Sequence, residues 1–114
     1  MIDEAALRRT AGTPAVMREQ LRHLIGMCDL PHITIGILPS RVGGHAVVGG
    51  PLTVLRMPDR QLPDIAYLDQ EAGGQHARTA AHVDYCRHVL NQLAIAAETA
   101  GPPQQVLTQI LRDI

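Results

Sequence analysis

Four residues in the middle of the chain carry side chains suited to acid–base chemistry or to binding a polar ligand: His45, Tyr67, Asp69 and Glu71. Tyr67, Asp69 and Glu71 alternate along one segment, so in a strand they project to the same side. If the loop with His45 folds over the end of that strand, these groups line one polar pocket. Such a pocket could bind a small polar ligand or assist a proton transfer. In the alternative arrangement, Asp69 caps a turn and His45 faces solvent.

A metal site has to be considered because the chain has six histidines. It contains no His-x-x-x-His pair and no HExxH motif, and the gap between His82 and His88 puts them on different faces of a helix. We therefore expect no metal and no cofactor. Asp84 precedes His88 by one helical turn, and Glu19 precedes His23 in the same way. Each pair is either a surface ion pair or, beside a pocket, a histidine base oriented by a carboxylate.

Motifs for nucleophilic catalysis and nucleotide binding are missing from the sequence. Ser40 is the only serine and lies outside any GxSxG elbow, while Cys86 falls on an apolar helical stripe. Cys28 and Cys86 form no CxxC pair, so we expect two reduced, packed thiols. The glycine pairs of the 43–50 loop lack both the Lys-Ser/Thr of a P-loop and the Rossmann spacing.

The composition is that of a globular protein. The chain has 114 residues, 46% hydrophobic and 18% charged, which fits one domain spanning residues 1–114. Its only aromatic residues are Tyr67 and Tyr85, and its net charge is −1, so we expect no direct binding of nucleic acid. There is no signal peptide and no apolar run of membrane-spanning length, so we expect no membrane contact and a cytoplasmic location.

Helix signals flank both ends of the chain. Asp3 can cap a short helix that runs to about Arg9, and Thr13 followed by proline starts a second helix that runs to about Cys28. Thr79 can cap a long helix with an apolar stripe at helical spacing. The Gly-Pro-Pro break at 101–103 separates it from a final amphipathic helix.

Strand signals lie between the helices. Residues 32–38 alternate β-branched residues at period two, and residues 52–57 and 65–69 predict two more strands, with a weaker fourth over 72–77. Short connections favour an antiparallel meander. We therefore expect an α+β fold, in which a small antiparallel sheet of three or four strands packs with two N-terminal and two C-terminal helices.

The order of motifs resembles the C-terminal domain of actinobacterial Xre-type helix-turn-helix regulators, the Scr antitoxin-like family, whose C-terminal half is a domain of unknown function. Gly44-His45, Gly50-Pro51-Leu52 and Tyr67-Leu68-Asp69 match its pattern in place, although the family more usually has an aromatic residue at Leu52 and Glu at Asp69. The resembling segments are TPAVMREQLRHL (13–24), HITIGILP (32–39), GGHAVVGGPLTVLRMP (43–58), LPDIAYLD (62–69) and HVDYCRHVLNQLAIAA (82–97).

The resemblance implies a regulatory domain. In that family an N-terminal helix-turn-helix domain binds DNA, and this domain contributes surfaces for a ligand, for self-association or for a small partner protein. The present chain supplies no basic recognition helix. We therefore expect an excised fragment or a stand-alone relative that lacks the DNA-binding half.

Two functional hypotheses follow. The first is a non-catalytic sensor or protein-interaction domain that forms a homodimer, binds a small partner protein or binds a small molecule, with His45, Tyr67, Asp69 and Glu71 as ligand-binding residues. The alternative is a stand-alone small enzyme of isomerase, cyclase or lyase type, recruited from that domain, for example into a biosynthetic pathway. In that case His45, Tyr67 and Asp69 would be its acid–base groups.

Overall fold

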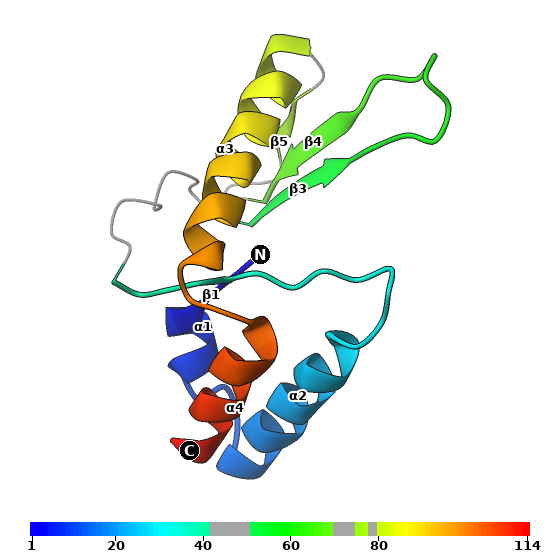
Figure 1. Cartoon of the computed structure of the whole chain (residues 1–114). Helices are drawn as coiled ribbons and strands as arrows, with labels where there is room; N and C mark the ends of the chain where they lie inside the picture. Colours follow the sequence, from blue (N-terminus) through cyan, green and yellow to red (C-terminus); the bar gives the residue numbers. More distant parts are fainter. Residues whose placement is uncertain (42–50, 70–74, 78–79) are drawn as a thin grey trace. The chain divides into compact units, whose positions relative to one another are not determined.

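The computed structural model describes residues 1–41, 51–69, 75–77 and 80–114 (Figure 1). Contacts divide the chain into two compact units: unit 1 is Met1–Val42 with Leu93–Ile114, and unit 2 is Gly43–Gln92. The helix α3, Ala80–Glu98, contributes residues to both. The mixture of helices and small sheets confirms the predicted α+β class.

The predicted helices of unit 1 are confirmed, together with the residues that start them. In α1, Glu4–Arg8, the Asp3 carboxylate accepts a hydrogen bond from the Ala5 N–H at 2.8 Å. In α2, Pro14–Met27, the Thr13 hydroxyl oxygen accepts from the Val16 N–H at 3.3 Å. Both bonds satisfy N–H groups that have no partner inside the first helical turn.

The last helix, α4, Pro103–Arg112, follows a sharp break after α3. Gly101 has a φ of 87°, a left-handed conformation that a residue without a Cβ adopts at low cost. Pro103 then occupies the first helical position, where no N–H is needed. The predicted cap of α3, Thr79, lies outside the described residues.

The strand predicted over residues 32–38 is wrong for most of its length. Only β2, Ile37–Leu38, is a strand, and it pairs in parallel with β1, Ile2–Asp3, instead of joining the meander. Because β1 has only two residues, the earlier residues of the segment find no partner in it. Gly36 lies at the start of this pairing, where a Cβ would come 2.5 Å from the Met1 sulfur.

The core of unit 1 is wholly aliphatic. Its buried residues come from α1, α2, β2 and α4, and they form one cluster in which Leu21 and Leu107 are completely buried. Helices α2 and α4 pack directly on each other. The buried members of the cluster are Leu7, Leu21, Ile37, Leu107 and Ile110.

Unit 2 contains the predicted antiparallel meander. The strands β3, Leu52–Leu55, β4, Ile65–Leu68, and β5, Gln75–Ala77, are hydrogen-bonded in that order, with β4 in the centre. The sheet has three strands because residues 37–38 belong to the other pairing. Both tyrosines, Tyr67 on β4 and Tyr85 on α3, lie in this unit. Among the described residues, no helix combines the length and apolar character needed to cross a bilayer.

Removing Leu107 should destabilise the protein strongly. We expect Leu107→Ala to lower the free energy of unfolding by about 2–5 kcal/mol, because it leaves a cavity in a core with no aromatic ring to fill it. Leu30, 38% exposed after α2, is the matched control, and its substitution by Ala should cost about 0.5 kcal/mol or less. Urea unfolding followed by helical circular dichroism measures both. Equal losses would contradict the assigned core.

Candidate functional site

Two of the four predicted site residues lie in the described part of the chain. Tyr67 is half-buried on the central strand β4, where the register pairs it with Thr53 on one side and His76 on the other. Asp69 is exposed just beyond β4, and its N–H donates to the Pro51 carbonyl at 2.9 Å. His45 and Glu71 lie outside the described residues, so the predicted cluster stays a prediction.

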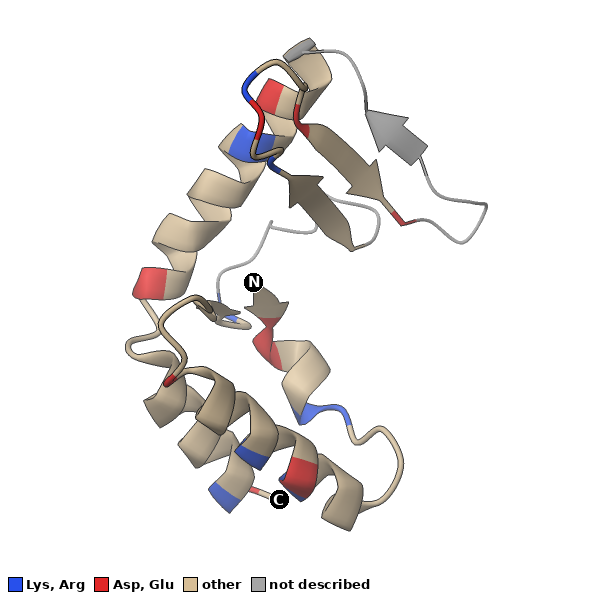
Figure 2. Cartoon of the chain, turned by 90° about the vertical axis from the view of Figure 1, so that its right-hand side faces the viewer, with Lys and Arg blue, Asp and Glu red and all other residues tan. Residues whose placement is uncertain are grey.

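The carboxylate of Asp64 fastens the β3–β4 hairpin to α3 within unit 2. It accepts from the Met57 N–H at 3.4 Å and forms an ion pair with Arg87 at 3.2 Å, with only 14% of its side chain exposed. Figure 2 shows charged residues of both signs where the hairpin comes beside α3. Arg87 also forms an ion pair with Asp84 at 3.5 Å, so the ion pair of Asp84 is with Arg87 and not with His88.

Replacing Asp64 should loosen the hairpin that carries Tyr67. We expect Asp64→Ala to lower the free energy of unfolding by about 1–3 kcal/mol, because a partly buried charge-assisted bond and a backbone N–H lose their acceptor. Asp84→Ala removes the other carboxylate that pairs with Arg87. Because the Asp84 side chain is 72% exposed, this variant should lower the free energy of unfolding by less than about 1 kcal/mol. If thermal unfolding ranked the two variants the other way, Asp64 would not be the anchor.

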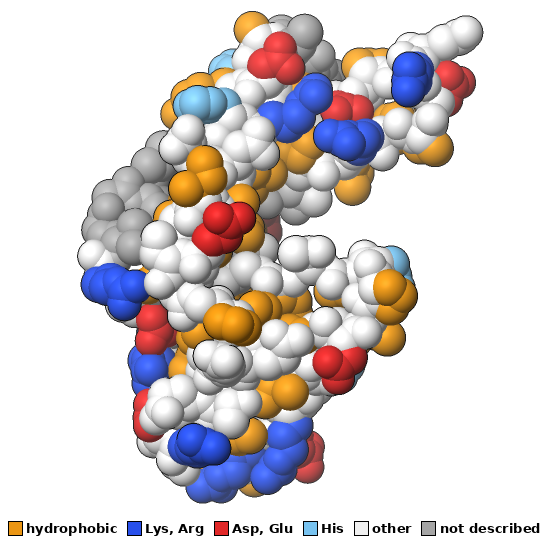
Figure 3. Space-filling model, in the orientation of Figure 1, with side chains coloured by type: hydrophobic (Ala, Val, Ile, Leu, Met, Phe, Trp, Pro, Cys, Tyr) orange, Lys and Arg blue, Asp and Glu red, His pale blue; other side chains and the backbone are white. Residues whose placement is uncertain are grey.

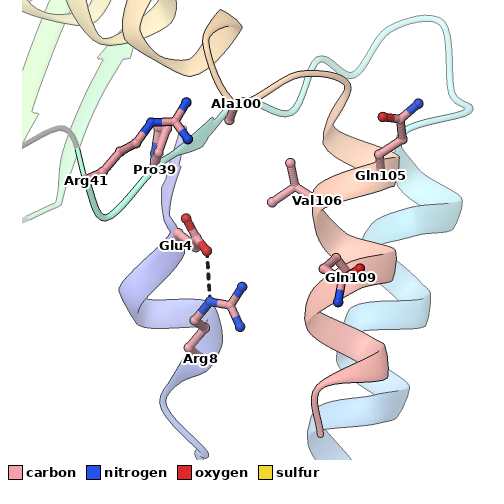
Figure 4. Close-up of a pocket in the computed structure, with 8 residues that line it drawn as sticks. All are labelled: Glu4, Arg8, Pro39, Arg41, Ala100, Gln105, Val106 and Gln109. Atoms are coloured by element: carbon pink, nitrogen blue, oxygen red, sulfur yellow. Dashed lines mark hydrogen bonds and ion pairs between the residues drawn. The ribbon is translucent and has the colours of Figure 1, made fainter.

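Unit 1 contains an open cavity of about 310 Å³, lined by both polar and apolar residues, that the sequence did not predict. Helix α1 forms one wall, α4 forms the other, and the segment after β2 closes one end (Figure 4). Val106 gives the wall of α4 an apolar surface that faces α1. The residues that line the cavity are Glu4, Arg8, Pro39, Arg41, Ala100, Gln105, Val106 and Gln109.

A hydrogen-bonded network joins α1 to α4 beside the cavity. The Arg8 guanidinium donates to the Glu4 carboxylate at 2.8 Å and to the Asp113 carboxylate at 2.9 Å. The Gln109 amide donates to the other oxygen of Asp113 at 2.9 Å. Figure 3 shows basic side chains gathered around this end of unit 1, where Arg18 also donates to the Ile114 carbonyl. The network therefore joins residues of opposite charge from both walls.

The network shifts two pKa values in opposite directions. The hydrogen bond from Arg8, followed by that from Gln109, holds the pKa of the Asp113 carboxyl below its ordinary value of 3.8. The hydrogen bonds to Asp113 and then to Glu4 raise the pKa of Arg8 further. Both groups are therefore charged at neutral pH.

Two further bonds fix the end of the cavity. The Ser40 N–H donates to the second oxygen of Glu4 at 3.3 Å, which ties the segment after β2 to α1. Arg41 donates to the Thr99 carbonyl, just beyond α3, at 3.0 Å. Within the described ranges of the chain, no carboxylate pairs with Arg41.

Sequence patterns gave little indication of this site. Glu4, Gln105 and Gln109 each look like an ordinary polar residue on the outer face of an amphipathic helix. The one usable signal is the spacing of Glu4 and Arg8, one helical turn apart, which predicts an ion pair but no cavity.

The described residues contain no group of three His, Cys, Asp or Glu side chains that could hold a metal ion. Cys28 and Cys86 are free and half-buried. Burial, followed by the charge of Asp29, raises the pKa of the Cys28 thiol, which lowers its thiolate fraction at neutral pH.

The contribution of Asp113 to stability should depend on pH. Because its pKa is lower in the folded chain, its contribution is complete above about pH 4 and is lost as the pH falls through the lower, folded value. The stability difference between the parent chain and Asp113→Asn should therefore be largest near neutral pH and should shrink in acid. Urea unfolding across this pH range measures it, with Asp29→Asn as an exposed control. A difference that does not depend on pH would contradict the role of the carboxylate.

Comparison with known proteins identifies the domain. The family model of a domain of unknown function (DUF5753) matches residues 1–109, a range that includes residues of both units and every residue that lines the cavity. No curated protein and no solved structure matches the chain. The predicted resemblance is thus confirmed for the domain itself. The chain belongs to the DUF5753 family.

Proposed function

We propose that this chain is a non-catalytic sensor domain and that the cavity of unit 1 holds its ligand. The observation that carries the proposal is the assembly of the cavity from four separate parts of the chain. They are α1, the segment after β2, the α3–α4 turn and α4. A molecule bound there contacts all four at once, so its binding favours the folded arrangement of unit 1.

The lining of the cavity suits binding better than catalysis. Its eight described residues include no His, Cys, Ser, Thr, Tyr or Lys, and its one carboxyl group, that of Glu4, already accepts bonds from Arg8 and Ser40. Guanidinium and amide groups form directional hydrogen bonds but do not exchange protons readily at neutral pH. The side chains can recognise a polar molecule without transforming it.

The regulatory setting is also part of the proposal. The motifs at 44–45, 50–52 and 67–69 support a relation to the C-terminal half of Xre-type, antitoxin-like helix-turn-helix regulators of actinobacteria. In such a setting the domain acts in the cytoplasm, as a homodimer or with a small partner protein. The apolar face of α4 is used by the core of unit 1. A partner surface on the C-terminal helices of unit 1 would therefore involve exposed side chains of α3 such as Ile95.

Binding of a small molecule by the isotope-labelled chain tests the sensor proposal. Mixtures of amino acids, organic acids, sugars, nucleosides and inorganic phosphate should include a compound that saturably shifts the side-chain amide signals of Gln105 and Gln109 in nuclear magnetic resonance spectra. Gln105→Leu should weaken that binding about fivefold, the effect of one lost hydrogen bond, while Gln20→Leu on the exposed face of α2 should not. If no compound shifts these signals, the cavity is not a ligand site.

A further inference from the structure

Two ionised side chains of opposite charge that line the cavity keep unused hydrogen-bonding capacity. Within the described residues, each oxygen of Glu4 accepts one hydrogen bond, from Arg8 or from Ser40, whereas a carboxylate offers about four acceptor positions. Among the same residues, Arg41 donates one bond, to the Thr99 carbonyl, whereas a guanidinium has about five N–H groups. Both side chains can therefore accept a further partner without losing the bonds that hold them.

The two groups lie at the same end of the cavity. The Glu4 carboxylate holds the backbone N–H of Ser40, and Arg41 is the next residue along the chain. Figure 4 shows Glu4 pointing from α1 toward the segment that carries Pro39 and Arg41. Both side chains line the same cavity, and among the described residues no ion pair joins them. A ligand that bridges them needs a cation and an anion close together.

The remaining lining residues limit the size and polarity of that ligand. Pro39, Ala100 and Val106 offer small apolar surfaces, and the Gln105 amide can both donate and accept. A volume of about 310 Å³ is at the small end of the range for ligand sites. These features fit a compact molecule with a short aliphatic part.

We propose that the cavity binds a small aliphatic α-amino acid as its zwitterion, with the ammonium at Glu4 and the carboxylate at Arg41. This inference rests on the proposed sensor function of the same cavity. A phosphate dianion fits poorly, because it would face the Glu4 carboxylate while Arg8 is already bonded to Glu4 and Asp113. A simple cation fits poorly as well, because Arg41 would repel it.

Capped forms of one amino acid separate the two charge contacts. L-leucine should bind the full chain with a Kd of about 1 mM or lower, as followed by the side-chain amides of Gln105 and Gln109. N-acetyl-L-leucine lacks the ammonium and L-leucinamide lacks the carboxylate, so each should bind at least about tenfold more weakly. Equal binding of all three compounds would overturn the inference. So would the failure of L-leucine, L-valine and L-alanine to bind while another compound shifts the same signals, an outcome that leaves the sensor function standing.

Two variants assign each charge to its partner. Arg41→Gln should weaken the binding of L-leucine about tenfold and leave the binding of L-leucinamide unchanged. Glu4→Gln should weaken the binding of L-leucine and leave the binding of N-acetyl-L-leucine unchanged. Arg22→Gln, on the exposed side of α2 and outside the cavity, is the control and should change neither. Because Glu4 also accepts hydrogen bonds from Arg8 and Ser40, circular dichroism must show that the Glu4→Gln variant is folded. If it is not folded, Arg41→Gln alone tests the proposed binding mode. Equal weakening of free and capped compounds by Arg41→Gln would contradict the carboxylate contact.

Discussion

The burial of the apolar face of α4 is the interaction on which the rest of unit 1 depends. Leu107 and Ile110 meet side chains from α1, α2 and β2, so one helix holds three other elements in place. Aliphatic contacts are not directional and do not by themselves fix the rotation of a helix. Polar bonds at the surface supply that direction, above all those of Arg8 with Glu4 and Asp113. The core sets the spacing of α1 and α4, and these bonds set which side chains line the cavity between them.

Structure and recognition share the same atoms at this site. Glu4 joins α1 to the segment after β2 through the Ser40 N–H, and it is also the proposed contact for a ligand ammonium. Arg41 likewise joins that segment to the residue after α3 while facing the cavity. A ligand that bonds to both Glu4 and Arg41 would reinforce the hydrogen bonds that join the segment after β2 to α1 and to the residue after α3. Ligand binding and local stability are therefore expected to rise together.

The sequence was informative where a local rule decides the structure. Asp3 and Thr13 cap helices in the chain as their chemistry predicts, and Gly101 ends a helix as expected. The alternating isoleucines before β2 led to a wrong strand prediction, because a strand needs a partner and β1 supplies only two residues. That partner lies about 35 positions away, and no local pattern reveals a parallel pairing so short. The cavity escaped prediction for the same reason, since Arg8 and Gln109 become neighbours only through Asp113.

The all-aliphatic core of unit 1 has a practical consequence. The chain has no Trp or Phe, and its two tyrosines, Tyr67 and Tyr85, both belong to unit 2. Intrinsic fluorescence and near-ultraviolet absorption therefore report on unit 2, while the packing of Leu21 and Leu107 contributes no signal at these wavelengths. Comparing tyrosine emission with total helix content would show whether the two units melt together or in separate steps. The uneven placement of aromatic rings gives the chain a built-in label for one half of its fold.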